Sequence, residues 1–220
     1  MTASMADTKK RRAAEAALQH IPSGSVLGVG TGSTVRFLVE TLAAHPGHVR
    51  AAVSSSNATT ALLDAARIPV LDLNDVADLQ LYIDGADEAS RARHLIKGGG
   101  GALTREKIIA AAAARFICII DDSKLVGTLG AFPLPLEVIP MARALVARRL
   151  AARGARPVWR QGFVTDNGNH ILDVHGLSIQ DPPTLETELA GITGVVTVGL
   201  FARRPADMLL VGTDQGTVTL

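Results

Sequence analysis

Two short stretches of this chain bring acids, lysines and glycines together at a density that indicates catalysis. Residues 82–88 read Tyr-Ile-Asp-Gly-Ala-Asp-Glu, and residues 97–107 read Lys-Gly-Gly-Gly-Gly-Ala-Leu-Thr-Arg-Glu-Lys. Glycines let backbone N–H groups approach a ligand without a Cβ in the way. Acids and lysines supply proton transfer and charge neutralisation. A loop that only had to be solvated would have little need for both.

The second stretch contains a candidate base and a candidate cation for an oxyanion. Thr104 is predicted to cap a helix, which places Glu106 in its first turn. The helix dipole favours a charged carboxylate there, and a general base must be charged at neutral pH. Lys97, before the glycines, is a candidate to stabilise a developing oxyanion. The alternative is that Glu106 and Lys107 belong to an exposed helix start that follows a flexible glycine linker. Four glycines directly before a capped helix disfavour this alternative.

The first stretch places three acids at the end of an apolar run. Asp84, Asp87 and Glu88 follow the predicted strand at residues 79–83. Such acids bind a metal ion, accept hydrogen bonds from sugar hydroxyls or act as acid and base. We predict no metal site, because no histidine lies nearby and Lys97 would compete with a cation. A solvated acidic turn remains the alternative.

A third glycine-rich stretch, residues 28–34, reads Gly-Val-Gly-Thr-Gly-Ser-Thr. It matches neither the dinucleotide fingerprint nor the nucleotide P-loop. Its backbone N–H groups and hydroxyls still form an anion site if a helix begins there. A tight strand-to-helix turn with a Ser/Thr cap explains the same residues equally well. Lys124, after the apolar run at residues 116–120, suits a phosphate but is weak evidence alone.

Alternating strands and helices position these stretches. The predicted strands cover residues 25–29, 51–53, 69–71, 79–83 and 116–120, and the predicted helices cover residues 9–20, 35–44, 58–67 and 104–114. This alternation predicts an α/β fold, with a Rossmann-like, mostly parallel sheet covered on both faces. Ligands of such sheets lie at the carboxyl ends of the strands. We therefore expect the loops after Val29, Val53, Ile83 and Ile120 to converge.

The pattern changes after residues 133–135, which read as a stiff Pro-Leu-Pro connector. The predicted elements there are helices at residues 141–153 and 185–190 and strands at residues 157–161, 163–165, 170–174 and 195–200. The Asn-Gly pair in the turn at residues 166–169 indicates a hairpin. We predict a smaller α+β domain over residues 131–205. Residues 1–130 and 206–220 form the main domain, and residues 208–212 return to its sheet.

Composition excludes several classes of protein. The chain has 220 residues, is 47% hydrophobic and carries a formal net charge of +1, so no nucleic-acid or membrane partner is expected. The single cysteine, Cys118, lies in an apolar run, is expected in the core and fits a reducing compartment. Residues 1–12 lack a secretory pattern and no apolar run approaches about 18 residues. We expect a cytoplasmic protein.

Taken together, the motifs resemble ribose-5-phosphate isomerases of the A type over almost the whole chain. The matching stretches are residues 28–34, 53–56, 82–88, 97–100, 102–108, 123–124, 132–140 and 164–169. Such a set in this order is highly specific. The sequence departs from the family at Gly101, where alanine is common, and we expect this glycine to loosen the loop slightly.

The resemblance implies interconversion of ribose 5-phosphate and ribulose 5-phosphate without a cofactor or metal, in a homodimer or homotetramer. Glu106 would move the proton, and Lys97 with the amides of Gly98, Gly99 and Gly100 would bind the oxygens of the reacting carbons. Asp84 and Asp87, with Gly85 and Ala86 between them, would bind sugar hydroxyls and assist ring opening. The phosphate ligands would be Thr31, Gly32, Ser33, Thr34 and Lys124, with Lys10 as a further candidate.

Two other functions share this fold. A sugar-phosphate-sensing domain would bind without turnover, but such domains are normally joined to a DNA-binding segment, and only about 24 residues precede the first predicted strand. A coenzyme A transferase uses a glutamate nucleophile, but the paired acids favour a sugar. The intact pair of Lys97 and Glu106 favours catalysis.

Overall fold

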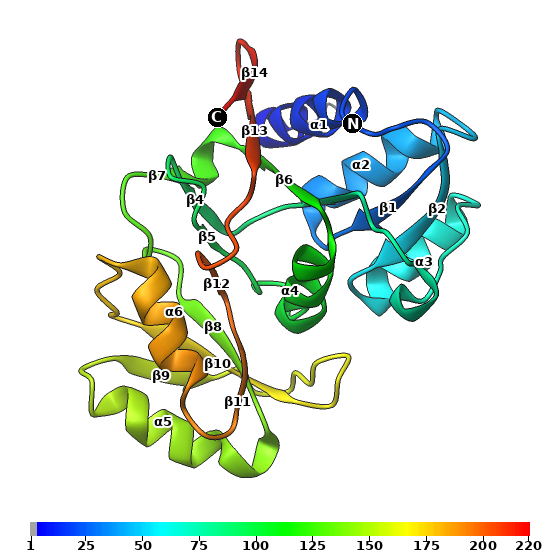
Figure 1. Cartoon of the computed structure of the whole chain (residues 1–220). Helices are drawn as coiled ribbons and strands as arrows, with labels where there is room; N and C mark the ends of the chain where they lie inside the picture. The colour runs from blue at the N-terminus through cyan, green and yellow to red at the C-terminus, as the bar shows by residue number, and fades with distance from the viewer. Residues whose placement is uncertain (1–3) are drawn as a thin grey trace. The chain divides into compact units, whose positions relative to one another are not determined.

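A six-stranded sheet is the largest element of the computed structural model, which describes residues 4–220 (Figure 1). Its order is β14-β13-β6-β3-β1-β2, and all neighbours except the edge pair β13 and β14 are parallel. This confirms the predicted α/β fold with a mostly parallel sheet. The strands are β1 (Ser25–Val29), β2 (Val49–Ser54), β3 (Leu81–Asp84), β6 (Arg115–Asp121), β13 (Met208–Thr213) and β14 (Gly216–Thr219).

The strand order contains a topological switch point. From β1 the chain moves outward to β2, then crosses to the other side of β1 to form β3 and later β6. Ligand crevices in open α/β sheets lie where the direction of winding reverses, outside the carboxyl ends of the strands. The switch point therefore lies between the loop after β1 and the loop after β3, where the sequence places Gly30 and Asp84.

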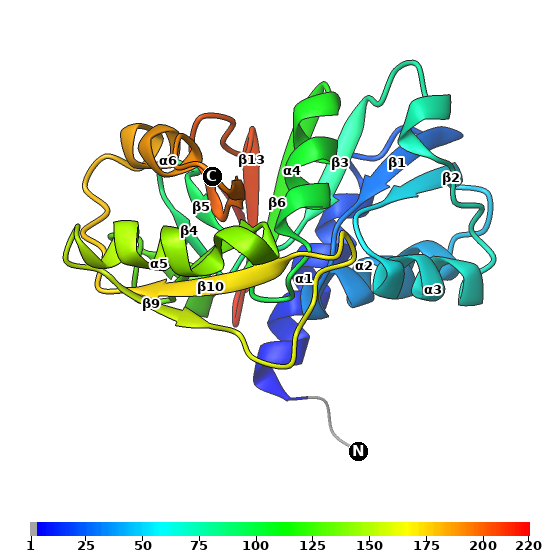
Figure 2. The ribbon, with the colours of Figure 1, turned by 90° about the horizontal axis from the view of Figure 1, so that it is seen from below.

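Helices cover both faces of this sheet. Leu27 and Val29 of β1 point into a core formed with α1 (Met5–Leu18) and α2 (Ser33–Ala43), and α3 (Asn57–Ala65) packs beside α2 (Figure 2). Gly28 points to the opposite face, where a Cβ would lie 2.9 Å from Ile109 of α4 (Leu103–Ala112). Each fully buried leucine or valine stabilises the fold by about 1.5–3 kcal/mol.

The second unit of the chain contains two small sheets. One has the antiparallel order β11-β8-β10-β9, built from β8 (Leu134–Val138), β9 (Arg156–Trp159), β10 (His170–His175) and β11 (Val195–Val198). It shares a core with α5 (Arg143–Ala151) and α6 (Pro182–Ala190). The other has the order β12-β5-β4-β7, from β4 (Glu88–Ser90), β5 (Leu95–Ile96), β7 (Leu125–Val126) and β12 (Leu200–Phe201).

Three short turns of 3-10 helix complete the elements: η1 (Leu73–Asp75), η2 (Asp122–Lys124) and η3 (Pro140–Ala142). Cys118 is fully buried in β6, as expected of a core cysteine. No helix within residues 4–220 is both long and apolar enough to span a membrane.

The predicted Pro-Leu-Pro connector at residues 133–135 is wrong because most of it belongs to a strand. Residues 134–138 form β8, a buried strand between β10 and β11. A proline cannot donate to a ladder, but the carbonyl of Pro135 still accepts, and it takes the N–H of Gly199 at 2.8 Å. The predicted strand at residues 69–71 is reduced to an isolated bridge at Val70. The predicted strand at residues 163–165 does not form, because β10 pairs with β9 instead.

The contacts divide the chain after Gly85. One unit holds residues 4–85, 108–125 and 206–220, and the other holds residues 86–107 and 126–205. The sequence-based division kept residues 86–130 with the main sheet. Residues 86–107 instead pack with the second unit, because β4 and β5 pair with each other and β5 pairs with β12. Asp84 thus belongs to the first unit, whereas Lys97 and Glu106 belong to the second.

Candidate active site

The carboxylate of Asp84 organises the switch point of the large sheet. Its Oδ1 accepts the N–H of Thr31 at 3.0 Å and the N–H of Gly85 at 2.7 Å, and its Oδ2 accepts the hydroxyl of Tyr82. The residue is 0% exposed. A buried carboxylate needs such donors. Asp84 therefore holds the loop after β1 against the end of β3, a structural duty that sequence reasoning did not assign to it.

Gly30 is required by this arrangement. A Cβ on Gly30 would lie 1.9 Å from the Cγ of Asp84, which no rotamer change of a fully buried side chain can relieve. We predict that Gly30→Ala lowers the free energy of unfolding by about 3 kcal/mol, measured by chemical denaturation. Gly127→Ala is the control, because nothing lies within 4 Å of its added Cβ. Equal losses in both variants would contradict this account of Gly30.

The hydroxyl of Thr31 ties together the loops after β1 and β2. It lies 2.8 Å from the Oγ of Ser55, 2.7 Å from the Oγ of Ser56 and 3.2 Å from the Oγ1 of Thr59. With the bond from Thr31 to Asp84, the loops after β1, β2 and β3 meet at one edge, as expected. Thr31, a predicted phosphate ligand, is therefore held by neighbouring side chains.

The start of α2 follows directly after Thr31 and has no side-chain cap. Gly32 has φ +126° and makes no side-chain cap, and Gly32 and Ser33 are exposed, whereas Thr34 is buried. The first amides of a helix have no partner within the helix and carry the positive end of its dipole. Phosphate binding by residues 32–34 stays a prediction, and the side chain of Thr34 is buried.

The turn after β6 carries Lys124 and is fixed by α1. Lys124 is half-buried at the end of η2. The Nζ of Lys9 lies 2.9 Å from Asp122 of the same turn and 3.1 Å from Asp214, and these hydrogen bonds raise the pKa of Lys9. Lys9 is therefore the lysine of α1 that contacts this turn, and phosphate binding by its neighbour Lys10 stays a prediction.

In the second unit, Lys97 and Glu106 form a buried ion pair. The Nζ of Lys97 lies 3.2 Å from the Oε2 of Glu106, with side chains 2% and 5% exposed. Glu106 stands in the first turn of α4, as predicted. The predicted cap is wrong: the helix begins at Leu103, and the hydroxyl of Thr104 donates to Glu137 at 2.6 Å.

The backbone of Lys97 is held closely. Its N–H donates to the carbonyl of Gly199 at 2.8 Å, and a Cβ on Gly199 would lie 2.4 Å from the carbonyl oxygen of Lys97. The ring of Phe201 lies 5.5 Å from the Nζ of Lys97 and 4.3 Å from the Nζ of Lys107. Burial lowers the pKa of Lys107, and its ion pair with Glu186 opposes this effect. Nothing in the sequence pattern pointed to this second ion pair, in which Lys107 is half-buried and Glu186 is buried.

The glycine run is packed on both sides. The N–H of Gly99 donates to the Oδ2 of Asp87 at 2.7 Å, and a Cβ on Gly99 would lie 2.5 Å from the Oδ1 of the same residue. Gly101 has φ +80°, and a Cβ there would lie 2.2 Å from the ring of Phe163. We expected Gly101 to loosen the loop, but in the structure it permits close packing against Phe163.

Glu137 of β8 is a hub that sequence reasoning missed. This fully buried carboxylate accepts hydrogen bonds from Thr104 at 2.6 Å, Thr165 at 3.0 Å, Asn167 at 3.2 Å and Asn169 at 2.8 Å. It joins the first turn of α4 to the turn before β10. The only sequence signal was the Thr-Asp-Asn-Gly-Asn stretch, read as a hairpin turn.

No group of three or more histidine, cysteine or acidic side chains within residues 4–220 is arranged to hold a metal ion.

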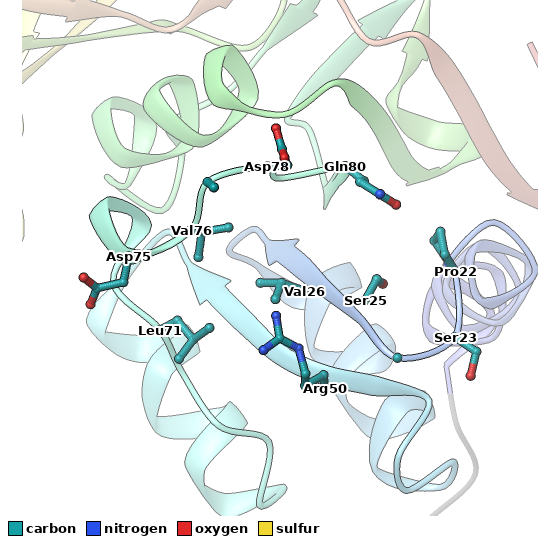
Figure 3. A pocket seen from close by; sticks show the side chains of 12 residues that line it. Pro22, Ser23, Ser25, Val26, Arg50, Leu71, Asp75, Val76, Asp78 and Gln80 are labelled. Carbon is teal, nitrogen blue, oxygen red and sulfur yellow. The ribbon is translucent and has the colours of Figure 1, made fainter.

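A cavity of about 550 Å³ lies at the amino ends of β1 and β3, where Arg50 extends over Ser25 and Val26 (Figure 3). Ser23, Asp75, Asp78 and Gln80 add further polar groups to its lining. Ligands of parallel sheets bind at the opposite, carboxyl edge, so this cavity is not the expected site.

Comparison with known proteins identifies the family. Residues 51–216 match the model of ribose 5-phosphate isomerase A (phosphoriboisomerase A). The chain belongs to this family. Ribose 5-phosphate isomerase A from Neisseria gonorrhoeae is 47% identical and superposes with a TM-score of 0.97 over 100% of this chain and 98% of its own. The enzyme from Methanocaldococcus jannaschii is 38% identical, with a TM-score of 0.91 over 96% and 97% of the two chains.

A third solved structure is a D-ribose-5-phosphate isomerase in complex with phospho-erythronic acid. It is 36% identical, with a TM-score of 0.94 over 99% of each chain. The resemblance read from the motifs is therefore confirmed. Like its family, ribose 5-phosphate isomerase A, this chain is an aldose–ketose isomerase of the pentose phosphate pathway and acts on a sugar phosphate.

Proposed function

We propose that Glu106 moves the proton in the interconversion of D-ribose 5-phosphate and D-ribulose 5-phosphate. The carboxylate takes the proton from C2 of the open-chain aldose. The C–H electron pair becomes the C1–C2 double bond, and the carbonyl pair moves onto O1. After a proton passes from O2 to O1, the same carboxyl group returns its proton to C1 and the carbonyl forms at C2. Positioned acid–base groups contribute about 10²–10⁴-fold.

The observation that carries this proposal is the buried contact between Lys97 and Glu106 at 3.2 Å. A base and a cation held together away from water suit a reaction in which a carbon loses a proton while a neighbouring oxygen gains negative charge. The ammonium of Lys97 supplies the positive charge next to the enediolate. We therefore propose a reaction that needs no cofactor, because lysine and backbone amides already stabilise this charge.

We assign the two ends of the sugar phosphate to different elements. The amides of Gly32, Ser33 and Thr34 and the ammonium of Lys124 bind the phosphate, because they combine open helix amides with a cation. Thr31 shapes this loop through its bonds to neighbouring hydroxyls. Lys10 is kept as a further candidate ligand.

The acids after β3 recognise the sugar itself in this proposal. Asp87 is only half-buried and binds sugar hydroxyls, beside the backbone of Gly85 and Ala86. Asp84 is fully buried and fixes the loop after β1. The predicted help of Asp84 in ring opening remains part of the proposal. The amides of Gly98 and Gly100 bind the oxygens of the reacting carbons, whereas the N–H of Gly99 already donates to Asp87.

Assembly and location are proposed from the family resemblance alone. We propose a cytoplasmic homodimer or homotetramer, and light scattering of the purified protein measures its mass. We also propose that this chain binds phospho-erythronic acid, because its carboxylate places negative charge where the enediolate has it.

One assay tests the proposed function. Protein treated with a metal chelator is mixed with ribose 5-phosphate, and formation of the ketose is followed. We expect saturable turnover that the chelator does not change. Saturable binding without turnover would contradict the proposal and indicate a sugar-phosphate sensor. Loss of turnover on chelation, with recovery on adding a divalent cation, would contradict the cofactor-free mechanism.

A further inference from the structure

The glycine run of the second unit is held by a side chain that comes from far along the chain. The Nη1 of Arg160, just after β9, donates to the carbonyl of Gly99 at 3.0 Å and to the carbonyl of Gly98 at 3.3 Å. One cation thus fixes two consecutive peptide groups. These lie between Lys97 and the helix that carries Glu106.

The first of these peptides is fixed at both ends. Its carbonyl, that of Gly98, accepts from Arg160 and from the N–H of Gly101 at 2.9 Å. Its N–H, that of Gly99, donates to Asp87 at 2.7 Å. Glycine peptides reorient easily because no Cβ restricts φ and ψ. Opposed partners on the carbonyl and on the N–H prevent this rotation.

The second peptide is fixed at its carbonyl end only. In a trans peptide the C=O and the following N–H point in opposite directions. Because Arg160 holds the carbonyl of Gly99, the N–H of Gly100 must point away from the guanidinium. Gly100 is exposed, and its N–H donates to no group of the described residues 4–220. It is an available donor whose direction Arg160 sets.

Arg160 is itself firmly placed. Its Nε donates to the Oδ2 of Asp173 at 2.9 Å and its Nη2 donates to the Oδ1 at 2.5 Å, which is the two-point geometry of an arginine–carboxylate fork. Asp173 lies in β10, opposite Val158 of β9. The ring of Phe163 lies 5.4 Å from the guanidinium and packs against Gly101. The small sheet therefore clamps the glycine run at two points.

We infer that Arg160, anchored by Asp173, is a positioning residue that orients the N–H of Gly100 toward the enediolate oxygen. This inference rests on the proposed function, since it assigns a task to the glycine amides in that reaction. Donors stabilise a transition state only if they are already aimed at the oxygen that becomes charged. Misplacement by about 1 Å costs up to about 10²-fold in rate.

The test compares Arg160→Lys, Arg160→Ala and wild type. Lysine keeps the charge but cannot form the fork with Asp173 and reach two carbonyls together. We expect kcat to fall about 10- to 100-fold in both variants, with KM changed by less than about 3-fold. Affinity for phospho-erythronic acid should fall by the same factor as kcat. Added guanidinium should restore part of kcat in Arg160→Ala and none in Arg160→Lys.

Two further variants make the outcome decisive. Arg153→Ala removes another arginine–carboxylate pair of the same unit, that with Glu188, and should keep wild-type kcat. Glu106→Gln is measured alongside. A loss in Glu106→Gln with wild-type kcat in Arg160→Lys would overturn this inference alone, as would a loss confined to KM. Wild-type kcat in Glu106→Gln would instead overturn the proposed function. If Arg160→Ala fails to fold, Arg160→Lys decides.

Discussion

Glu106→Gln is expected to lower kcat by about 10²–10⁴-fold, because the amide cannot accept the proton from the sugar carbon. Glutamine keeps the shape of the side chain in the first turn of α4. The fold should therefore be retained, as circular dichroism would show. The ammonium of Lys97 loses its buried partner, and breaking a buried pair costs about 3–5 kcal/mol at most. Binding of ribose 5-phosphate should persist, measured by calorimetry.

Two comparisons separate chemistry from stability. Glu188→Gln removes an exposed carboxylate of α6 and should leave kcat unchanged and stability within about 0.5 kcal/mol. Glu106→Asp keeps the base but withdraws it from the substrate, so its kcat should fall between those of wild type and Glu106→Gln. Turnover near that of wild type in Glu106→Gln would remove this residue from the mechanism.

Lys97→Met is expected to lower kcat by about 10²–10³-fold, the usual cost of losing one donor to a developing oxyanion. Methionine fills a similar volume in this buried position but carries no charge. A second effect follows from the ion pair. A buried carboxylate without its cation keeps its proton to higher pH, so the acidic limb of the pH–rate profile should move upward. Steady-state kinetics across pH measure both effects.

A double-mutant cycle shows whether the two residues act as a unit. We expect the loss in Lys97→Met/Glu106→Gln to be well below the product of the two single losses, because each variant already disables the same step. Lys97→Arg keeps the charge with a larger head and should retain more activity than Lys97→Met. Equal activity in Lys97→Met and wild type, with an unchanged pH profile, would show that the ion pair is only structural.

Much of the large sheet could be predicted because its signals are local. Apolar runs of three to five residues separated by helical segments indicate β1, β2, β3 and β6, and the rule for parallel sheets places their following loops at one edge. The position of Glu106 in a first helical turn was predicted from Thr104 as the cap, and it is confirmed although the helix begins at Leu103. The catalytic role of these residues stays a prediction.

Other parts of the site depend on contacts between distant residues and could not be predicted. Glu137 meets Thr104 across 33 positions, and Arg160 meets Gly99 across 61 positions. Hydrophobic periodicity and motif spacing do not indicate which distant residues come into contact. Thr104 looked like a cap because its hydroxyl can accept a backbone N–H, but Thr104 lies inside the first turn of α4 and its hydroxyl donates to the buried carboxylate of Glu137. Likewise, Pro135 was predicted to lie in a connector, but it belongs to β8, where its carbonyl accepts a hydrogen bond.

A crystal structure of this chain with phospho-erythronic acid tests the central claim most directly. The account predicts that a carboxylate oxygen of Glu106 lies within about 3.5 Å of the acid carbon, which stands in for C2 because this acid has one carbon fewer than the sugar. It also predicts that the Nζ of Lys97 lies within about 3 Å of an oxygen of the ligand's carboxylate. A bound acid whose carboxyl carbon lies far beyond the reach of Glu106 would contradict the proposed mechanism.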